Sequence, residues 1–355
     1  YLNWNSKTLQ VYFIATMISK ITSRICILLL SCFCFASCID NNEPPNTTKG
    51  NFEALWNIIN EHYCFFDEKQ KEYGLDWNEV YKRYAPTASM SLTKAQEFEL
   101  LSNMLSELRD GHVNLYSTFD VGRYWAWREN YPSNFSQELI DEYLGTNYKI
   151  AAGFYYRILT DNTGYIRCAS FASTKGEGNL DNVFYYLLAC KGLIIDLRDN
   201  SGGLVTAAEQ LAARFTNKKV LVGYIQHKTG KGHRDFSPLQ AQYLTPSNGL
   251  RWQKPVVVIT NRGVYSAANE FVKYMKNLPN VTIIGDKTGG GAGMPFSSEL
   301  PNGWSVRFSA IPSYDSEKKT TEFGIDPHHN VSLNMEDLQR KKDTLIEFAR
   351  KIIAK

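Results

Sequence analysis

The amino-acid sequence predicts an α/β protein in which a small helical domain precedes a domain with a largely parallel sheet. Two observations support this fold class. Apolar residues recur at helical spacing between Phe52 and Leu115, and from Ile150 onward short β-rich runs alternate with helical patterns. Strands that alternate with helices at this pitch are typical of βαβ units, in which the strands are parallel.

The first segment of the chain has the pattern of an export signal. An apolar run, Ile25–Ser37, follows the basic residues Lys20 and Arg24 and is too short to span a bilayer. Small residues precede Cys38, as at the cleavage site of lipoproteins, so Cys38 is expected to become the acylated first residue. We therefore expect residues 1–37 to be removed, leaving a lipoprotein of the bacterial cell envelope on the outer membrane. A buried helix of the fold is the alternative.

Met17 stands just ahead of these basic residues, which favours translation starting there, with residues 1–16 upstream of the translated chain. Residues 38–50 are polar, lack apolar periodicity and are expected to form a flexible tether. The cysteines that follow this tether are Cys64, Cys168 and Cys190. They do not make a disulfide framework. One bridge is possible in an exported protein, but scattered cysteines are more often buried small hydrophobes.

The segment 51–118 is expected to form the N-terminal helical domain. Two helices account for its apolar positions, which are Phe52, Leu55, Trp56, Ile59 and Tyr63 in the first and Phe98, Leu101, Met104, Leu105 and Leu108 in the second. Asp76 and the run Ser91–Lys94 supply helix N-caps, and the second helix is expected to end at Arg109–Gly111. Residues 119–150 are aromatic and polar with weak periodicity, and are expected to form a connecting segment.

Residues 151–355 are expected to form the α/β domain. Its predicted strands are 154–159, 164–168, 193–197, 220–225, 256–259 and 281–284, and its predicted helices are 182–189, 206–215 and 267–275. No internal repeat is visible in this part of the sequence.

Two strand-turn-helix motifs carry the chemical information, namely Gly192–Gly203 and Val256–Glu270. In each, an apolar strand breaks into a polar or Gly-rich turn and then opens a helix. This arrangement leaves backbone N–H groups and one hydroxyl, that of Ser266, pointing at the same pocket, which is the geometry of acyl transfer. A serine before a helix is, in most sequences, simply an N-cap, and this alternative stays open for Ser266.

The residues of both motifs resemble those of the S41 serine peptidases, the family of C-terminal processing proteases and the tricorn core protease. The resemblance runs from about Phe52 to the C-terminus. The family pattern T-N-x-x-x-x-S-A-x-E is matched by Thr260, Asn261, Ser266, Ala267 and Glu270. The resemblance implies a ClpP/crotonase-like βαβ core with the site at helix N-termini, and Ser266 as the nucleophile. Many members carry a PDZ domain, which needs roughly 80 to 100 residues, so the segment 119–150 is expected to lack one.

The base of this site is implied to be a histidine. In one branch of the family the base is the second lysine of a G-E-K-T-x-G-K-G run, but the matching run here, Gly285–Ala292, has Gly291 at that position, and Lys287 matches the non-catalytic lysine. The tricorn-like branch uses an upstream histidine, and the run Leu108–Tyr116 resembles its L-x-D-G-H-x-x-L segment. The resemblance therefore implies that His112 is the general base.

The remaining parts of the site are an acid and an oxyanion hole. The run Phe323–Pro327 resembles the G-I-E-P segment that carries the family's acid, which implies Asp326 as the third catalytic residue, with Asp where Glu is usual. Gly203 and Ala267 are assigned to the oxyanion hole, with Gly202 as the adjacent candidate, because backbone N–H groups at these turns meet the developing charge.

These residues predict a cell-envelope serine protease that hydrolyses peptide bonds of a peptide or protein substrate through an acyl-enzyme. No cofactor and no metal is expected, and a net charge of +3 in 355 residues without a basic stripe predicts no nucleic-acid partner. Two alternatives stay open. The first is a catalytically weak or inactive peptide-binding lipoprotein of the same fold, and the second is an esterase. The sequence gives no indication of the oligomeric state.

Overall fold

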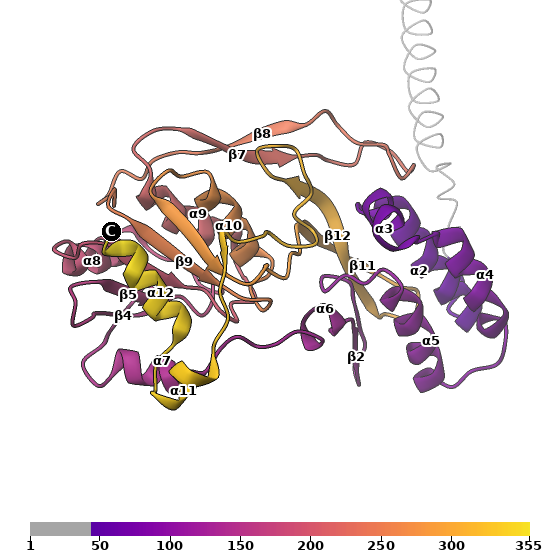
Figure 1. Cartoon of the computed structure of the whole chain (residues 1–355). Helices are drawn as coiled ribbons and strands as arrows, with labels where there is room; N and C mark the ends of the chain where they lie inside the picture. The colour runs from indigo at the N-terminus through magenta and orange to yellow at the C-terminus, as the bar shows by residue number, and fades with distance from the viewer. Residues whose placement is uncertain (1–43) are drawn as a thin grey trace, which may run out of the picture. The chain divides into compact units, whose positions relative to one another are not determined.

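Two β-sheets organise residues 44–355, the part of the chain that the computed structural model describes (Figure 1). The expected signal segment, Cys38 and the rest of the expected tether up to residue 43 lie outside the described residues. Within residues 44–355, no helix is both long enough and apolar enough to cross a bilayer.

The helical segment begins the described part. Its helices are α2 Thr48–His62, α3 Phe66–Tyr73, α4 Trp77–Ala88 and α5 Lys94–Ser106. Side chains cap α4 at Asp76 and α5 at Thr93, as the sequence predicts. Helix α2 begins at Thr48, inside the expected tether, because the Thr47 hydroxyl accepts a hydrogen bond from the Gly50 N–H at 3.1 Å. The tether predicted to reach residue 50 therefore ends earlier.

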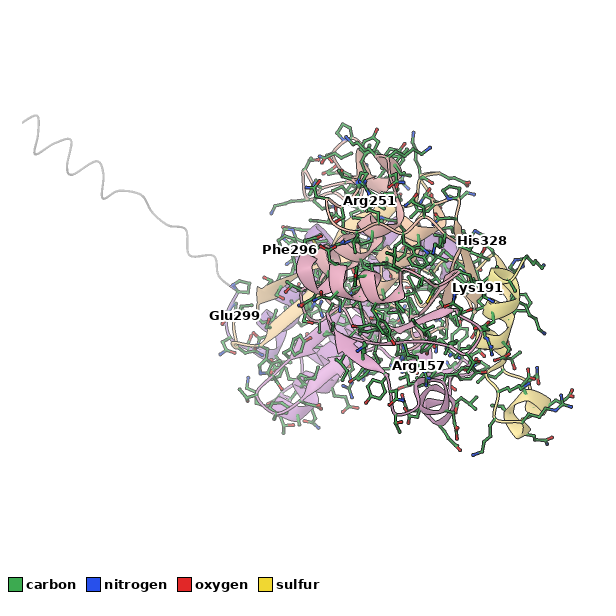
Figure 2. The ribbon with its side chains drawn as sticks, turned by 90° about the vertical axis from the view of Figure 1, so that its left-hand side faces the viewer. Arg157, Lys191, Arg251, Phe296, Glu299 and His328 are labelled. Atoms are coloured by element: carbon green, nitrogen blue, oxygen red, sulfur yellow. The ribbon has the colours of Figure 1, made fainter. Side chains whose placement is uncertain are left out.

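An antiparallel sheet packs against these helices. Its order is β2-β1-β12-β7-β8, and β11 pairs with the free side of β12. The strands are β1 Asn114–Tyr116, β2 Val121–Arg123, β7 Val220–Ile225, β8 Gln240–Leu244, β11 Gly293–Glu299 and β12 Ser305–Tyr314. In the described residues β11 pairs with β12 alone, and the exposed side chains of Phe296 and Glu299 lie on this strand (Figure 2).

The helical segment and this sheet share one hydrophobic core. The apolar sides of α2, α4 and α5 pack with side chains on and beside β11 and β12, which are Ala292, Leu300, Trp304, Val306 and Phe308. The segment expected to be an N-terminal helical domain is therefore continuous with strands from the far end of the chain. The shared core therefore holds α2, α4 and α5 beside β11 and β12.

The second sheet has the order β13-β10-β9-β6-β5-β4-β3. Its strands are β3 Lys149–Ala151, β4 Phe154–Ile158, β5 Gly164–Arg167, β6 Leu193–Asp196, β9 Val256–Thr260, β10 Val281–Gly285 and β13 His329–Asn330. The strands from β5 to β13 are parallel, and β4 pairs antiparallel with both β3 and β5. This confirms the predicted α/β class with a largely parallel sheet, although β7, predicted beside these strands, lies in the antiparallel sheet.

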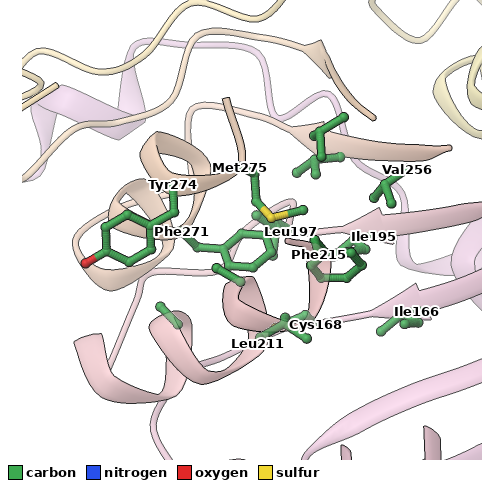
Figure 3. Close-up of a cluster of buried hydrophobic side chains, with 14 of the residues drawn as sticks. Ile166, Cys168, Ile195, Leu197, Leu211, Phe215, Val256, Phe271, Tyr274 and Met275 are labelled. Atoms are coloured by element: carbon green, nitrogen blue, oxygen red, sulfur yellow. The ribbon is translucent and has the colours of Figure 1, made fainter. Parts of the chain in front are cut away.

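Helices cover both faces of the second sheet. One face packs against α9 Val205–Ala212 and α10 Ala267–Lys276 (Figure 3) and against α8 Glu177–Leu187, and the other packs against α7 Gln137–Leu144 and α12 Thr344–Ile353. Successive strand residues alternate between these cores, so Ile195 and Val258 face α10 while Ile194 and Val257 face α12. Short elements complete the chain, namely α6 Ala126–Glu129, α11 Met335–Gln339 and a 3₁₀ turn at Ala213–Phe215.

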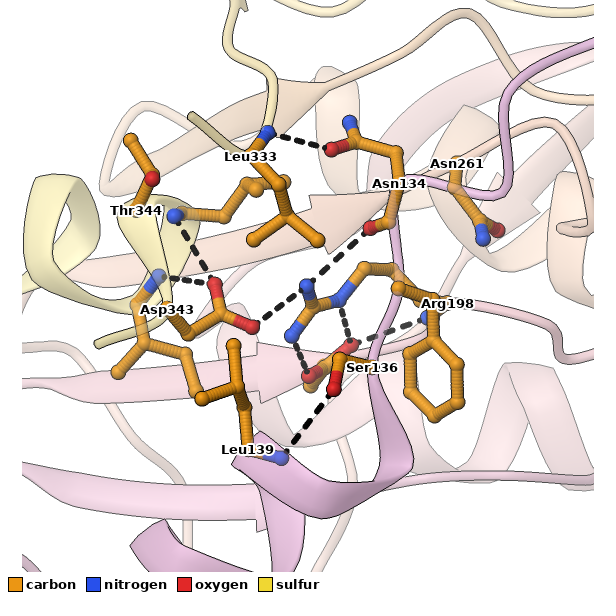
Figure 4. Close-up of polar contacts among 12 residues, drawn as sticks. Asn134, Ser136, Leu139, Arg198, Asn261, Leu333, Asp343 and Thr344 are labelled. Atoms are coloured by element: carbon orange, nitrogen blue, oxygen red, sulfur yellow. Dashed lines mark hydrogen bonds and ion pairs between the residues drawn. The ribbon is translucent and has the colours of Figure 1, made fainter. Parts of the chain in front are cut away.

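A buried ion-pair cluster joins α12 to the parallel sheet. Arg198, which follows β6, lies 2.6 Å from an oxygen of Asp196 and 2.8 Å from an oxygen of Asp343, and none of the three side chains is exposed (Figure 4). The Asp343 carboxylate also accepts the N–H groups of Leu345 and Ile346, which begin α12. The cluster therefore fixes the last helix against the strand that leads into the Gly202 loop.

Candidate active site

Ser266 lies in the turn between β9 and α10. Its backbone has φ 57° and ψ −124°, a left-handed φ that costs a non-glycine residue of order 1–3 kcal/mol. Two backbone hydrogen bonds hold the turn, from the Tyr265 N–H to the Asn200 carbonyl at 3.0 Å and from the Ser266 N–H to the Gly290 carbonyl at 2.9 Å. The Ser266 side chain makes no capping bond with α10. Its hydroxyl is therefore not used as an N-cap.

His112 contacts this hydroxyl from a segment 154 positions earlier in the chain. The distance between His112 Nε2 and Ser266 Oγ is 2.9 Å. His112 lies in the turn between α5 and β1 and is 4% exposed. Burial lowers the pKa of His112 to about 4, although the Asp110 carboxylate opposes this effect. The ring is therefore neutral at pH 7, and Nε2 is able to accept the Ser266 proton.

Asp110 organises the turn that carries His112. Its carboxylate is buried and accepts four hydrogen bonds, from the His112 N–H at 2.8 Å, the Ser309 hydroxyl at 2.8 Å, the Tyr63 hydroxyl at 3.0 Å and the Tyr265 hydroxyl at 3.3 Å. Burial alone would raise the pKa of Asp110, but nearby positive charge and these donors lower it below its usual value. Asp110 is not among the predicted site residues, although it lies inside the motif that carries His112.

The expected oxyanion donors lie around Ser266. The N–H groups of Gly203 and Ala267 have no acceptor among the described residues, so both are free to meet a substrate oxygen. The Gly202 N–H instead donates to Asn200 Oδ1 at 2.9 Å, which removes it as a donor. Gly202 is needed for space, because a Cβ there would lie 2.8 Å from the Ser266 Cβ and its φ is +101°.

Comparison with known proteins gives the family. The model of peptidase family S41 matches residues 162–331, and that of the tricorn protease C1 domain matches residues 44–106. A candidate peptidase from Parabacteroides merdae, known from its crystal structure, is 50% identical with a TM-score of 0.82, over 87% of this chain and 97% of that chain. The chain belongs to the S41 peptidase family.

Other S41 relatives are more distant. The carboxy-terminal processing protease CtpA of Bacillus subtilis is 26% identical over 156 residues, which are 44% of this chain and 32% of that protein. The match thus spans about a third of the length of this curated relative. The crystal structure of mature CPAF shares the fold with a TM-score of 0.68 at 12% identity, over 86% of this chain and 96% of that chain.

The structure explains why this S41 chain lacks the lysine of the Ser/Lys branch. Gly291, at the lysine position, has φ +75°, and a Cβ there would lie 2.3 Å from the Tyr265 ring. A side chain at this position would therefore collide with the residue before Ser266. Lys287 is 45% exposed and lies 4.0 Å from Asp326, so the structure does not bring it to the Ser266 hydroxyl.

Asp326 does not take the place expected of the third catalytic residue. Its side chain is 74% exposed and faces Lys287 rather than His112. The reason is local. The preceding residue, Ile325, is buried and its N–H donates to the Thr288 hydroxyl at 2.7 Å, which turns the next side chain outward. Within the described residues no hydrogen bond joins the Asp326 carboxylate to His112 Nδ1, so the predicted contact between Asp326 and His112 is wrong.

Glu322 is the acidic residue of that segment that reaches the interior. Its side chain is buried, accepts the Ala292 N–H at 3.0 Å and lies 2.9 Å from the Lys69 ammonium group. Burial, together with the negative charge of Asp110, raises the pKa of Glu322 to about 7 against the effect of Lys69. Sequence reasoning missed Glu322 because its only signal is a glutamate just ahead of the assigned motif.

An aromatic side chain covers the site from the segment expected to be a plain connection. The Trp127 ring stacks on the Tyr265 ring with centroids 4.2 Å apart. A Cβ at Gly111 or at Gly289 would lie 2.5 Å from an atom of Trp127, so both glycines leave room for it. Trp127 therefore packs against the three loops that carry His112, Ser266 and the glycine-rich run.

Proposed function

We propose that the chain is a serine protease that hydrolyses peptide bonds through an acyl-enzyme at Ser266, with His112 as the general base. The observation that carries the proposal is the 2.9 Å contact between Ser266 Oγ and His112 Nε2. Beside it lie the two N–H groups, of Gly203 and Ala267, that have no acceptor among the described residues. A nucleophile, a neutral base and oxyanion donors are the parts that acyl transfer needs.

In the proposed reaction the substrate carbonyl lies against the two free N–H groups. His112 Nε2 takes the hydroxyl proton as Ser266 Oγ bonds to the carbonyl carbon, and the carbonyl oxygen becomes an oxyanion. The protonated ring then gives its proton to the leaving amine, which breaks the peptide bond and leaves an ester on Ser266. A water molecule then attacks the ester carbon while His112 accepts its proton. The carboxylic acid product leaves, and the proton returns from His112 to restore the Ser266 hydroxyl.

The substrate class follows from the relatives. Because several curated relatives are named carboxy-terminal processing proteases, we extend peptide or protein cleavage near a C-terminus to this chain as part of the proposal. The esterase alternative uses the same oxyanion and acyl-enzyme. The inactive binding protein is disfavoured by the strained backbone of Ser266, since a fold that only binds has no need to hold this residue at φ 57°.

Covalent labelling of Ser266 tests the proposal. A fluorophosphonate needs an activated hydroxyl, so wild-type protein should gain one adduct by intact mass, mapped to Ser266, while Ser266→Ala gains none. Turnover of a quenched fluorescent peptide library beside a p-nitrophenyl ester then separates the protease from the esterase. Absence of an adduct in folded wild-type protein would leave the peptide-binding alternative.

We also propose that the protein is an exported lipoprotein of the bacterial cell envelope, attached to the outer membrane through Cys38. The support is the sequence pattern alone, a basic start, an apolar run and small residues before the cysteine. Mass spectrometry of protein from native membranes should find acyl chains on Cys38 as the first residue. Membrane-bound Cys38→Ser protein that keeps residues 1–37 would contradict the proposal and indicate an uncleaved anchor.

A further inference from the structure

Lys69 is a buried cation in a place that the proposed reaction does not explain. It lies in α3, is 1% exposed, and its Nζ lies 2.9 Å from Glu322 Oε1 and 3.2 Å from the Arg109 carbonyl oxygen. Burying an ammonium group costs free energy unless its charge is paired, so Lys69 needs ionic or hydrogen-bonding partners at this position. These partners come from two different loops, 253 and 40 positions away along the chain.

The first partner, the Arg109 carbonyl, belongs to the turn that carries His112. Arg109 has φ +45°, a left-handed backbone that a non-glycine residue adopts only under constraint. The next residue, Asp110, accepts the His112 N–H at 2.8 Å. Lys69 therefore constrains one side of this turn while the Asp110 carboxylate constrains the other.

The second partner, Glu322, connects Lys69 to the loop beside Ser266. The Glu322 carboxylate accepts the Ala292 N–H at 3.0 Å, and its backbone carbonyl accepts the Gly291 N–H at 3.1 Å. The residue before these, Gly290, accepts the Ser266 N–H at 2.9 Å. A short series of hydrogen bonds thus runs from the Lys69 ammonium group to the backbone of Ser266.

We propose that Lys69 is a positioning residue of the site, whose ammonium group joins the His112 turn to the Gly290–Ala292 loop and so fixes the distance between His112 Nε2 and Ser266 Oγ. This role rests on the proposed function for its catalytic meaning. Lys69 contacts neither reacting atom, and acts through Arg109 on one side and Glu322 on the other.

The charges around Lys69 are consistent with this role. Burial lowers the pKa of Lys69, but the neighbouring Glu322 and Asp110 carboxylates raise it above its ordinary value, so the amine stays charged. Without that charge two acidic groups would share one dry region, and Glu322, with its pKa already raised to about 7, would take up a proton. The titratable and charged groups that face this region include Tyr63, Cys64, Tyr73, Arg109, Asp110, His112, Tyr265, Arg307 and Glu322.

The test compares Lys69→Met, which is unbranched, one heavy atom shorter and uncharged, with wild-type protein. We expect kcat on a peptide substrate to fall about 30- to 100-fold with KM changed little, because a small misplacement of reacting groups costs about this much. A crystal structure of the variant should show His112 Nε2 and Ser266 Oγ separated beyond hydrogen-bonding distance. A kcat within about twofold of wild type, or an unchanged separation, would overturn the proposal.

Arg214→Met is the matched control. Arg214 is an equally buried cation whose ion-pair partners, Glu177 and Asp181, belong to α8 rather than to a loop of the site. This variant should lower Tm while kcat stays within about twofold of wild type. A loss of kcat equal to that of Lys69→Met would mean that removal of any buried cation has the same effect, and would contradict a positioning role.

A double variant covers the case in which Lys69→Met does not fold. Lys69→Met with Glu322→Gln removes both charges of the ion pair, and the Asp110 carboxylate keeps its four hydrogen-bond donors, so Tm should recover in part while kcat stays low. Recovery of kcat together with Tm would show that the pair is not needed for positioning. If wild-type protein neither cleaves peptides nor reacts at Ser266, the proposed function fails, and the distance between His112 and Ser266 in the variant crystals still decides the role of Lys69.

Discussion

His112 and Lys287 are the two residues whose substitution separates the possible bases of the site. We expect His112→Ala to lower kcat/KM by about 10³-fold or more, because a base and its nucleophile act as one unit. Lys287→Ala should change it by less than about twofold, since an exposed ion pair 4.0 Å long has little influence. Steady-state kinetics on one peptide substrate checks the ranking, and the reverse order would contradict the base assigned here.

The acid limb of the pH profile should report the burial of His112. The pKa of this ring is lowered to about 4, so kcat/KM should rise with pH and reach its plateau by about pH 6 rather than about pH 7.5. The same burial affects stability. Below the unfolded pKa of about 6.5, the unfolded chain binds more protons at His112 than the folded chain does. The free energy of unfolding that His112 contributes is therefore lost as the pH falls toward 4. An acid limb of the kcat/KM profile centred near the ordinary histidine pKa would argue that His112 is exposed to solvent.

The two acids of the 322–326 segment should differ sharply. Asp326→Asn is expected to leave kcat within about twofold of wild type, because its side chain is exposed and away from His112. Glu322→Gln should lower kcat about tenfold or more, since it removes the charge that pairs with buried Lys69. Kinetics of both variants, with Tm measured alongside, tests this order. Equal effects would return Asp326 to the site.

At the scale of the elements, the glycine-rich loop between β10 and β11 determines which base the fold accepts. Gly291→Lys restores the residue type of the Ser/Lys branch, yet its Cβ would lie 2.3 Å from the Tyr265 ring at a φ of +75°. We expect this variant to lose at least about 1–3 kcal/mol of unfolding free energy and to gain no activity in a His112→Ala background. Denaturant unfolding and kinetics of the double variant test both parts, and restored turnover would refute the steric argument.

Some elements are predictable from sequence because their signal is local. The strands β5, β6, β9 and β10 are short, mostly apolar runs that are almost wholly buried, so their bounds are predicted to within a residue or two. Strand β12 was missed, because Ser305–Tyr314 mixes buried and half-buried residues and includes a proline. Its pairing with β1 and β11 brings together residues that are far apart in the chain, which local patterns do not register.

The whole molecule depends on the buried cluster that fixes its last helix. Asp343→Ala would leave Arg198 without one of its two carboxylate partners and remove the cap of α12. We expect a loss of about 3–5 kcal/mol in unfolding free energy, measured by urea denaturation. The rate of labelling at Ser266 under native conditions should stay close to that of wild type, because α12 packs against β6, β9 and β10 of the parallel sheet. A lost label in folded protein would mean that the cluster also shapes the site.

The site itself was partly predictable for the same reason. Ser266, His112, Gly203 and Ala267 lie in motifs that are legible within ten residues, and the structure brings them together. The residues that hold them were not predictable in this way. Lys69 and Glu322 meet across 253 positions, and each alone resembles an ordinary surface charge. Only the packing of α3 against the far end of the chain makes them neighbours.

The separation of His112 from Ser266 along the chain also bears on when the protein acquires a reactive hydroxyl. The two residues lie 154 positions apart, and the contacts that support them come from α3 near the start of the described chain and from Glu322 near its end. His112 precedes Ser266, so a growing polypeptide carries the base first, and the contact between Lys69 and Glu322 that supports the pair forms only after Glu322 has emerged. Under the proposed function, the Ser266 hydroxyl would therefore stay inactive until the last strands of the chain are in place.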